Sequence, residues 1–153
     1  GPLAFKRCLD SFDHDHLTPL HVAARAVPPA LAKSEGLYKK MIKLLVQKGA
    51  RVRTADRTEN KRTALHVAVA EGNVVGLDAL LNTPGEPFRV DEGSQVESLM
   101  DAHGNTPPHL AAILGFAPAL EMCMEKKYYN TSTPFNLNVQ NSCGFTVLIA
   151  AIQ

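Results

Sequence analysis

Four short segments of this chain repeat one pattern, and this repetition constrains the fold more than any other feature. The segments read TPLHVAA from Thr18, TALHVAV from Thr63, TPPHLAA from Thr106 and TVLIAAI from Thr146. Self-similarity of this kind is typical of proteins built from like units, each of which packs only on its neighbours. The sequence therefore predicts a stack of repeated units.

Each segment has the chemistry of a helix start. The threonine hydroxyl can accept a hydrogen bond from a free amide of the first turn. Proline follows at the first helical position in two copies, where a missing N–H has no cost. The leucine and small alanines then fall at helical spacing, and alanines let a second helix approach closely. We expect Thr18, Thr63, Thr106 and Thr146 each to precede a helix.

A second apolar segment follows three of these starts. We predict helices over Tyr38–Lys48, Asn73–Leu81 and Pro118–Met124, the first ending at Gly49, a typical helix stop. Proline and glycine predict loops between the helices. The predicted loops are Ala26–Leu37, Asn82–Ser98 and Lys126–Asn138.

With the T-P-L-H-x-A-A segments in register, the chain from Asp13 to Gln153 resembles the ankyrin-repeat family. The resemblance implies an all-α solenoid of antiparallel helix pairs joined by hairpins. The family repeat has about 33 residues, whereas the threonines here are 45, 43 and 40 residues apart, so the repeats are irregular and carry long insertions.

The resemblance also divides the chain. Residues 1–3 are interpreted as the remnant of a protease-cleaved tag, and residues 4–12 as a leading segment or the end of a preceding element. The repeats then cover about 13–55, 56–100 and 101–140, with a partial repeat over 141–153. Because an unpaired helix cannot bury its apolar face alone, we expect a fragment of a longer protein.

The repeats depart from the family pattern at several positions. The family's hairpin glycine is present as Gly104 and Gly144, but His16 and Lys61 replace it in the first two hairpins, which we expect to bend differently or fray. Pro108 replaces a core leucine, and Ile149 replaces the repeated histidine.

Six histidines raise the question of catalysis or metal binding. His21, His66 and His109 recur with the repeat, and the resemblance implies that each imidazole bonds backbone between neighbouring hairpins. His14 and His16 alternate with two aspartates, but no distant Cys or His completes a zinc set, so a solvated hairpin tip is the better interpretation. We expect no cofactor, no metal and no enzymatic activity.

The cysteines and the apolar runs limit the classes of protein to which this chain can belong. The chain has three cysteines, Cys8, Cys123 and Cys143, and no C-x-x-C pair, which fits a reducing compartment. We expect Cys123 to lie in the core. No apolar run approaches the roughly 20 residues of a membrane helix. The expected location is the cytoplasm, the nucleus or both.

Charge is unevenly distributed although the net formal charge is only +1. Residues 33–62 contain ten Lys or Arg against three Asp or Glu, and residues 71–125 contain nine Asp or Glu against one Arg. Either stretch can be solvated loop surface or can steer a partner of complementary charge. Direct nucleic-acid or transcription-complex binding through residues 33–62 is an alternative function, and a targeting module of a larger enzyme is another.

The function predicted first is a scaffold or regulatory domain that binds another protein, of unknown identity, through a concave face. The resemblance implies that this face uses the variable positions of the hairpins and of the inner helix ends. Ile113 and Leu114 are apolar where a solvated face is polar, so they are the candidate hot spot. The predicted partner-binding residues are His14, Asp15, Leu17, Arg25, Ala26, Arg62, Ala70, Glu71, Ala102, His103, Asn105, Ile113, Leu114 and Phe145.

Overall fold

The computed structural model describes residues 8–9, 11–25, 32–51, 54–81, 100–124 and 139–152. Every regular element in these ranges is a helix, so the fold is all-α in the part of the chain that the structure describes. The helices are α2 (Pro19–Arg25), α3 (Ala32–Gln47), α4 (Ala64–Ala70), α5 (Val74–Leu81), α6 (Pro107–Leu114), α7 (Ala117–Met124) and α8 (Val147–Ala151).

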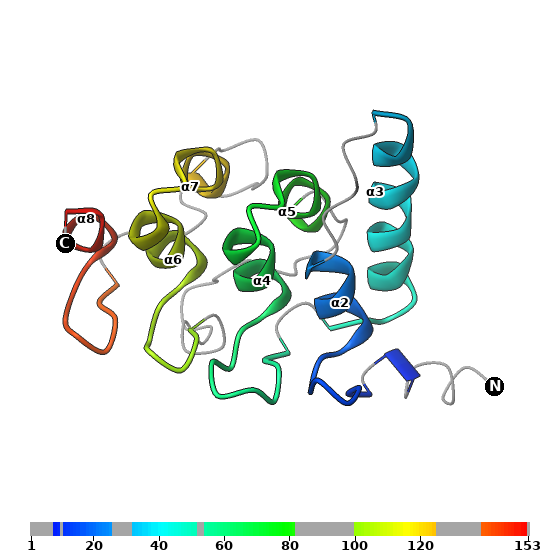
Figure 1. The fold of residues 1–153 in the computed structure, drawn as a ribbon, viewed down its shortest axis with the longest axis horizontal. Coiled ribbons are helices and arrows are strands. Elements are labelled where there is room, and N and C mark those ends of the chain that lie inside the picture. Colours follow the sequence, from blue (N-terminus) through cyan, green and yellow to red (C-terminus); the bar gives the residue numbers. More distant parts are fainter. Residues whose placement is uncertain are drawn as a thin grey trace.

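The helices form two layers with a row of hairpins along one side (Figure 1). The inner layer runs α2, α4, α6, α8, and each neighbouring pair in it is in contact. The outer layer contains α3, α5 and α7, in contact in that order. Figure 1 shows α5 and α7 almost end-on, whereas α3 lies with its axis in the plane of the view.

The four repeated threonines precede helices, as the sequence predicted. Helices begin at Pro19, Ala64, Pro107 and Val147, each one residue after its threonine. The Thr63 and Thr146 hydroxyls accept hydrogen bonds from the amides of His66 and Ile149.

The second helices also lie where they were predicted, with one correction. Helix α3 begins at Ala32, so the predicted loop over Ala26–Leu37 is wrong in its second half. The proline and glycine of this stretch predicted a loop, but Gly36 is a single exposed glycine, which costs a long helix only about 1 kcal/mol. The other two predicted loops, Asn82–Ser98 and Lys126–Asn138, lie outside the described residues.

The core is one continuous strip along the stack, as expected for units that bury their apolar faces on each other. It reaches from Leu9 through Leu20, Leu65 and Leu80 to Cys123. A small second cluster of Ala112, Val147 and Ala150 joins α6 to α8. Among the described helices, none is long and apolar enough to cross a membrane.

Candidate partner-binding surface

Four hairpins precede the inner helices, and one acidic or amide residue organises each of them. The hairpins span 13–17, 56–62, 101–105 and 141–145, and in each the first residue's amide donates to the last residue's carbonyl at 2.8–2.9 Å. The first residue's Oδ1 also accepts two backbone amides of its own loop. These four residues are Asp13, Asp56, Asp101 and Asn141.

All four hairpins share one left-handed residue. His16 and Lys61 have φ of 65° and 49°, and Gly104 and Gly144 have φ of 71° and 79°. At this residue the first two hairpins therefore bend as the glycine-containing hairpins do, which corrects the expectation that they bend differently there. The backbone of His16 and of Lys61 adopts the left-handed conformation that favours glycine, which has a conformational cost for a residue with a side chain.

The hairpins are joined edge to edge by backbone hydrogen bonds. The amide of Arg57 donates to the His16 carbonyl at 3.0 Å, and the amide of Ala102 donates to the Asn60 carbonyl at 2.8 Å. The amide of Ser142 donates to the His103 carbonyl at 3.0 Å. The exposed tips therefore have fixed positions relative to one another.

A second row of bonds passes through the repeated histidines, as the resemblance implied. Nε2 of His21, His66 and His109 lies 2.8, 2.6 and 3.0 Å from the carbonyl oxygens of Arg62, Asn105 and Phe145 respectively. In each case Nδ1 lies 2.7–2.8 Å from the hydroxyl of the preceding repeated threonine. Each buried ring thus links its own helix start to the next hairpin.

The hydrogen-bond partners of these rings assign one donor and one acceptor nitrogen to each ring. Nε2 faces a carbonyl and must donate, while Nδ1 faces a threonine amide at 3.2–3.3 Å and must accept. Burial lowers the pKa of His66 to about 4, and burial also lowers the pKa of His21. The three histidines are therefore structural links.

Most of the predicted binding residues are exposed, either at hairpin tips or at the ends of inner helices. His14, Asp15, Ala102 and His103 are exposed at hairpin tips. Arg25, Glu71, Ile113 and Leu114 are exposed at the ends of α2, α4 and α6, and Ala70 is half-buried beside Glu71. Ile113 and Leu114 keep 49% and 52% exposure, a large value for adjacent apolar side chains.

Two of the predicted residues must be corrected, and two others are less exposed than expected. Leu17 and Asn105 are buried, and the Asn105 side chain accepts a hydrogen bond from Asn141 Nδ2 at 2.9 Å, so both are framework residues. Arg62 and Phe145 are half-buried, and their carbonyls accept the histidine bonds. Ala26 lies outside the described residues.

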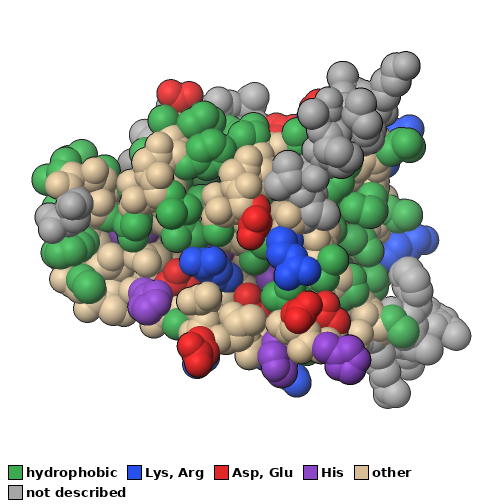
Figure 2. Space-filling view, viewed as in Figure 1, with side chains coloured by type: hydrophobic (Ala, Val, Ile, Leu, Met, Phe, Trp, Pro, Cys, Tyr) green, Lys and Arg blue, Asp and Glu red, His purple; other side chains and the backbone are tan. Residues whose placement is uncertain are grey.

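The second hairpin is two residues longer than the other three, and most of its exposed residues are absent from the predicted binding set. Glu59, Asn60 and Lys61 are exposed at its tip, and the Arg57 guanidinium lies 4.1 Å from the centre of the Phe12 ring. The seven-residue separation between Asp56 and Thr63, against five in the other repeats, was the available signal. Figure 2 shows charged and histidine side chains gathered along this edge of the molecule.

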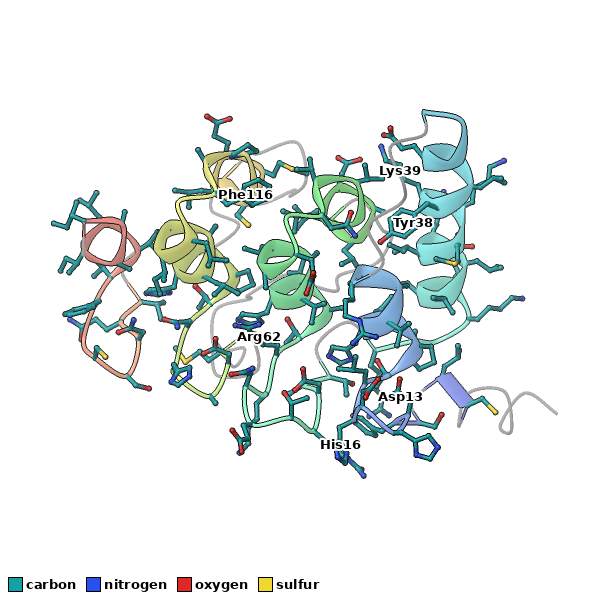
Figure 3. The ribbon with its side chains drawn as sticks, in the orientation of Figure 1. Asp13, His16, Tyr38, Lys39, Arg62 and Phe116 are labelled. Atoms are coloured by element: carbon teal, nitrogen blue, oxygen red, sulfur yellow. The ribbon has the colours of Figure 1, made fainter. Side chains whose placement is uncertain are left out.

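The Asp13–His16 run forms a capped turn at the tip of the first hairpin. All four side chains are exposed, and the hydrogen bond from the Leu17 amide holds the pKa of the Asp13 carboxyl below its usual value. The described residues contain no group of three His, Cys, Asp or Glu side chains placed to hold a metal ion. Figure 3 shows Asp13 and His16 at the same hairpin.

The geometry defines the class of protein as an all-helical repeat stack with an ordered row of exposed loop tips. No protein-family model matches the chain. The chain is 29% identical to human NF-kappa-B inhibitor delta in a 143-residue alignment that covers 87% of this chain and 44% of that protein. It is also 29% identical to the mouse NF-kappa-B inhibitor delta, over 87% of this chain and 42% of that protein.

The chain therefore spans less than half the length of these curated relatives. Their similarity supports the ankyrin-repeat resemblance that the T-P-L-H-x-A-A segments indicated.

Proposed function

We propose that this chain is an ankyrin-repeat module that binds a partner protein and has no catalytic role. The observation that carries the proposal is the double row of bonds between hairpins, which holds exposed tips of variable sequence in a fixed array. A preorganised array loses little conformational entropy on binding, which favours affinity. Binding would use the tips together with the inner helix ends.

The proposed partner is a transcription factor of the NF-kappa-B class. The relatives are named as inhibitors of NF-kappa-B, and the aligned segment covers most of this chain. A role in transcription regulation, in the cytoplasm, the nucleus or both, is part of this proposal. The apolar pair Ile113 and Leu114 is the proposed anchor, because a few desolvated apolar contacts carry most of the binding energy at such interfaces.

The basic stretch gives weaker support to the nucleic-acid alternative. Three of its cations are engaged or partly buried: Lys39 pairs with Asp78, Arg57 lies over Phe12, and Arg62 is half-buried. Nucleic-acid binding would lose affinity steeply with salt, whereas an interface anchored by apolar groups would not. The salt dependence of binding separates the two functions.

The test uses Ile113→Asp and Leu114→Asp, with Val74→Asp as the matched control. Val74 is 38% exposed at the start of outer helix α5, where an aspartate is compatible with the helix. Binding to a purified NF-kappa-B dimer would be measured by surface plasmon resonance. We expect each Ile113 or Leu114 variant to lose at least about ten-fold in affinity and the control to change little.

Thermal melts must accompany these measurements. If the Ile113 and Leu114 variants fold and bind normally, the anchor assignment is wrong. If wild type shows no affinity for the dimer, the partner assignment fails, and differential capture by wild type and Ile113→Asp would then identify the partner.

A further inference from the structure

Helix α3 exposes an apolar stripe that its contacts with the rest of the stack leave uncovered. Leu37, Met41 and Leu44 are 71%, 42% and 53% exposed, and they recur at i, i+4 and i+7, on one face of the helix. The neighbouring face, which packs on the stack, is buried through Tyr38 and Ile42. The apolar surface of α3 is therefore wider than the part of it that packs on the stack.

The corresponding face of α5 has a different composition. When the fully buried Ile42 and Leu77 are aligned, Met41 and Leu44 match Gly76 and Ala79, which are both buried. A Cβ added at Gly76 would lie 2.8 Å from the Tyr38 hydroxyl oxygen, so this face of α5 is in contact with α3. Small residues suit the closely packed face, and large residues stand on the uncovered face.

A groove continues this stripe between α2, α3 and the first hairpin. Its volume is about 570 Å³, and it is lined mainly by apolar side chains. Asp13 also lines it, but that carboxylate accepts amides of its own hairpin. The main lining residues are Phe12, Leu17, Pro19, Val22, Met41 and Leu45. A continuous apolar surface thus reaches from the groove onto α3.

Positive charge borders this surface. Lys40 and Lys48 are exposed on the same face as Leu37 and Leu44, at i+3 and i+11 from Leu37, and Lys43 is exposed beside them. Among the described residues, the ion pairs on α3 involve Lys39, whose side chain turns toward Asp78 on the other side of the helix. Figure 2 shows hydrophobic and basic side chains side by side at the end of the stack where Figure 1 places α3.

We infer that this groove and the exposed face of α3 form a second docking surface, which binds an acidic amphipathic helix of a partner protein. An apolar groove with a lysine border accepts the apolar stripe of a helix and pairs with carboxylates beside that stripe. Charge argues against two other occupants. Residues 1–7 contain Lys6 and Arg7, and a second copy of this surface would oppose lysine to lysine.

This surface lies at the α3 end of the stack (Figure 1). It borders the first hairpin through Asp13 and Leu17, but it includes neither the exposed tip of that hairpin nor the α6 residues Ile113 and Leu114. The inference does not depend on the proposed binding to an NF-kappa-B dimer. Each assignment can fail while the other holds.

The test is a selection from a displayed library of random helix-forming peptides of about 18 residues, long enough to form a helix on binding. The library would be depleted first on the Met41→Asp/Leu44→Asp double variant and then selected on wild type. We expect the enriched peptides to have apolar residues at helical spacing and a net negative charge. Absence of enrichment, or enrichment of neutral or basic peptides, would overturn the inference.

Fluorescence anisotropy on an enriched peptide gives the second measurement. Met41→Asp and the Lys40→Glu/Lys48→Glu pair should each weaken binding at least about ten-fold. Leu148→Asp, on α8 at the other end and 75% exposed, should not. Circular dichroism checks the fold of each variant, and both sets of substitutions are at exposed positions. Sedimentation that shows a dimer of wild type and a monomer of Met41→Asp would instead assign the surface to self-association and overturn the inference.

Discussion

Asn73 donates a hydrogen bond from Nδ2 to the Tyr38 hydroxyl oxygen at 2.7 Å, and this bond joins the start of α5 to α3. The Tyr38 hydroxyl in turn donates to the Ala23 carbonyl, and Asn73 Nδ2 donates to the Ala24 carbonyl at 2.8 Å. Both residues are buried, and burial raises the pKa of Tyr38. Figure 3 shows the Tyr38 side chain directed from α3 toward this junction. One buried polar network therefore ties the end of α2 to α3 and α5.

Gly76→Ala should destabilise the protein because this network leaves no room for a methyl group. A Cβ at this position would lie 2.4 Å from Asn73 Nδ2 and 2.8 Å from the Tyr38 hydroxyl oxygen. Displacing either group leaves buried polar atoms unpaired, so we expect a loss of about 1–3 kcal/mol in the free energy of unfolding by urea. The control is Gly36→Ala in α3, where nothing lies within 4 Å. That variant should gain about 0.5–1 kcal/mol. Equal effects at the two glycines would contradict the network.

The framework of the first helices was predictable from sequence, whereas the network around Asn73 was not. Threonine, proline and alanine act locally, so Thr63 and Thr106 specify helix starts wherever they occur. Tyr38 and Asn73 are 35 residues apart, and neither the tyrosine nor the asparagine belongs to the repeated T-P-L-H-x-A-A pattern. The candidate surface shows the same division. Ile113 and Leu114 were predicted from their place in the repeat and are exposed, whereas the exposed Glu59 and Asn60 were not predicted because the second hairpin is longer.

Lys61→Gly should stabilise the protein. Lys61 has a φ of 49°, a conformation that costs a side-chain-bearing residue roughly 1–2 kcal/mol. Because glycine also gains entropy in the unfolded chain, we expect a net increase of about 0.5–1 kcal/mol, measured by thermal and urea unfolding. A decrease would show that the exposed lysine side chain has a stabilising contact.

Alanine substitutions at the two hairpin glycines distinguish the cost of backbone strain from the cost of steric overlap. Gly104 and Gly144 both have left-handed φ, but a Cβ at Gly104 would lie 2.7 Å from the Ser142 amide nitrogen, while nothing lies within 4 Å of one at Gly144. We expect Gly144→Ala to cost about 1 kcal/mol and Gly104→Ala clearly more, since it also breaks the bond between the third and fourth hairpins. Urea unfolding of the two variants provides the comparison.

Stability should fall as the pH is lowered from 6.5 toward 4. The folded protein keeps His66 neutral down to a pKa of about 4, whereas the unfolded chain protonates it near 6.5, so the unfolded state binds more protons in this window. The loss from His66 approaches about 3 kcal/mol at pH 4, and His21 contributes with the same sign. His66→Gln should lower stability at pH 7 and flatten the slope between pH 4.5 and 6.5, whereas His103→Gln, at an exposed tip, should change neither. Parallel slopes in all three proteins would contradict the role of the buried ring.

Lys39 and Lys43 should respond differently to charge reversal, although both belong to the basic stretch. Lys39 Nζ lies 2.9 Å from Asp78 Oδ2 and 3.2 Å from Glu35 Oε1, and the Asp78 bond raises the pKa of Lys39. The pair is partly exposed and therefore contributes at most about 1 kcal/mol. We expect Lys39→Glu to lower stability by that order and Lys43→Glu to have no measurable effect. The double variant Lys39→Glu/Asp78→Lys should recover part of the loss, and failure of this recovery would show that the ion pair does not act between α3 and α5.

The three cysteines should divide into two reactive thiols and one protected thiol. Cys8 and Cys143 are exposed, whereas Cys123 is fully buried in α7, where burial raises the pKa of its thiol to about 12. Because only the thiolate is nucleophilic, Cys123 should react with Ellman's reagent only when the helix pair opens. We expect two fast equivalents in the native protein and a third at the rate of unfolding, which urea should accelerate. The Cys8→Ser/Cys143→Ser variant isolates the slow phase and turns it into a measure of local opening in the third repeat. A fast reaction of that variant in native buffer would show that Cys123 is accessible and that the core does not extend to α7.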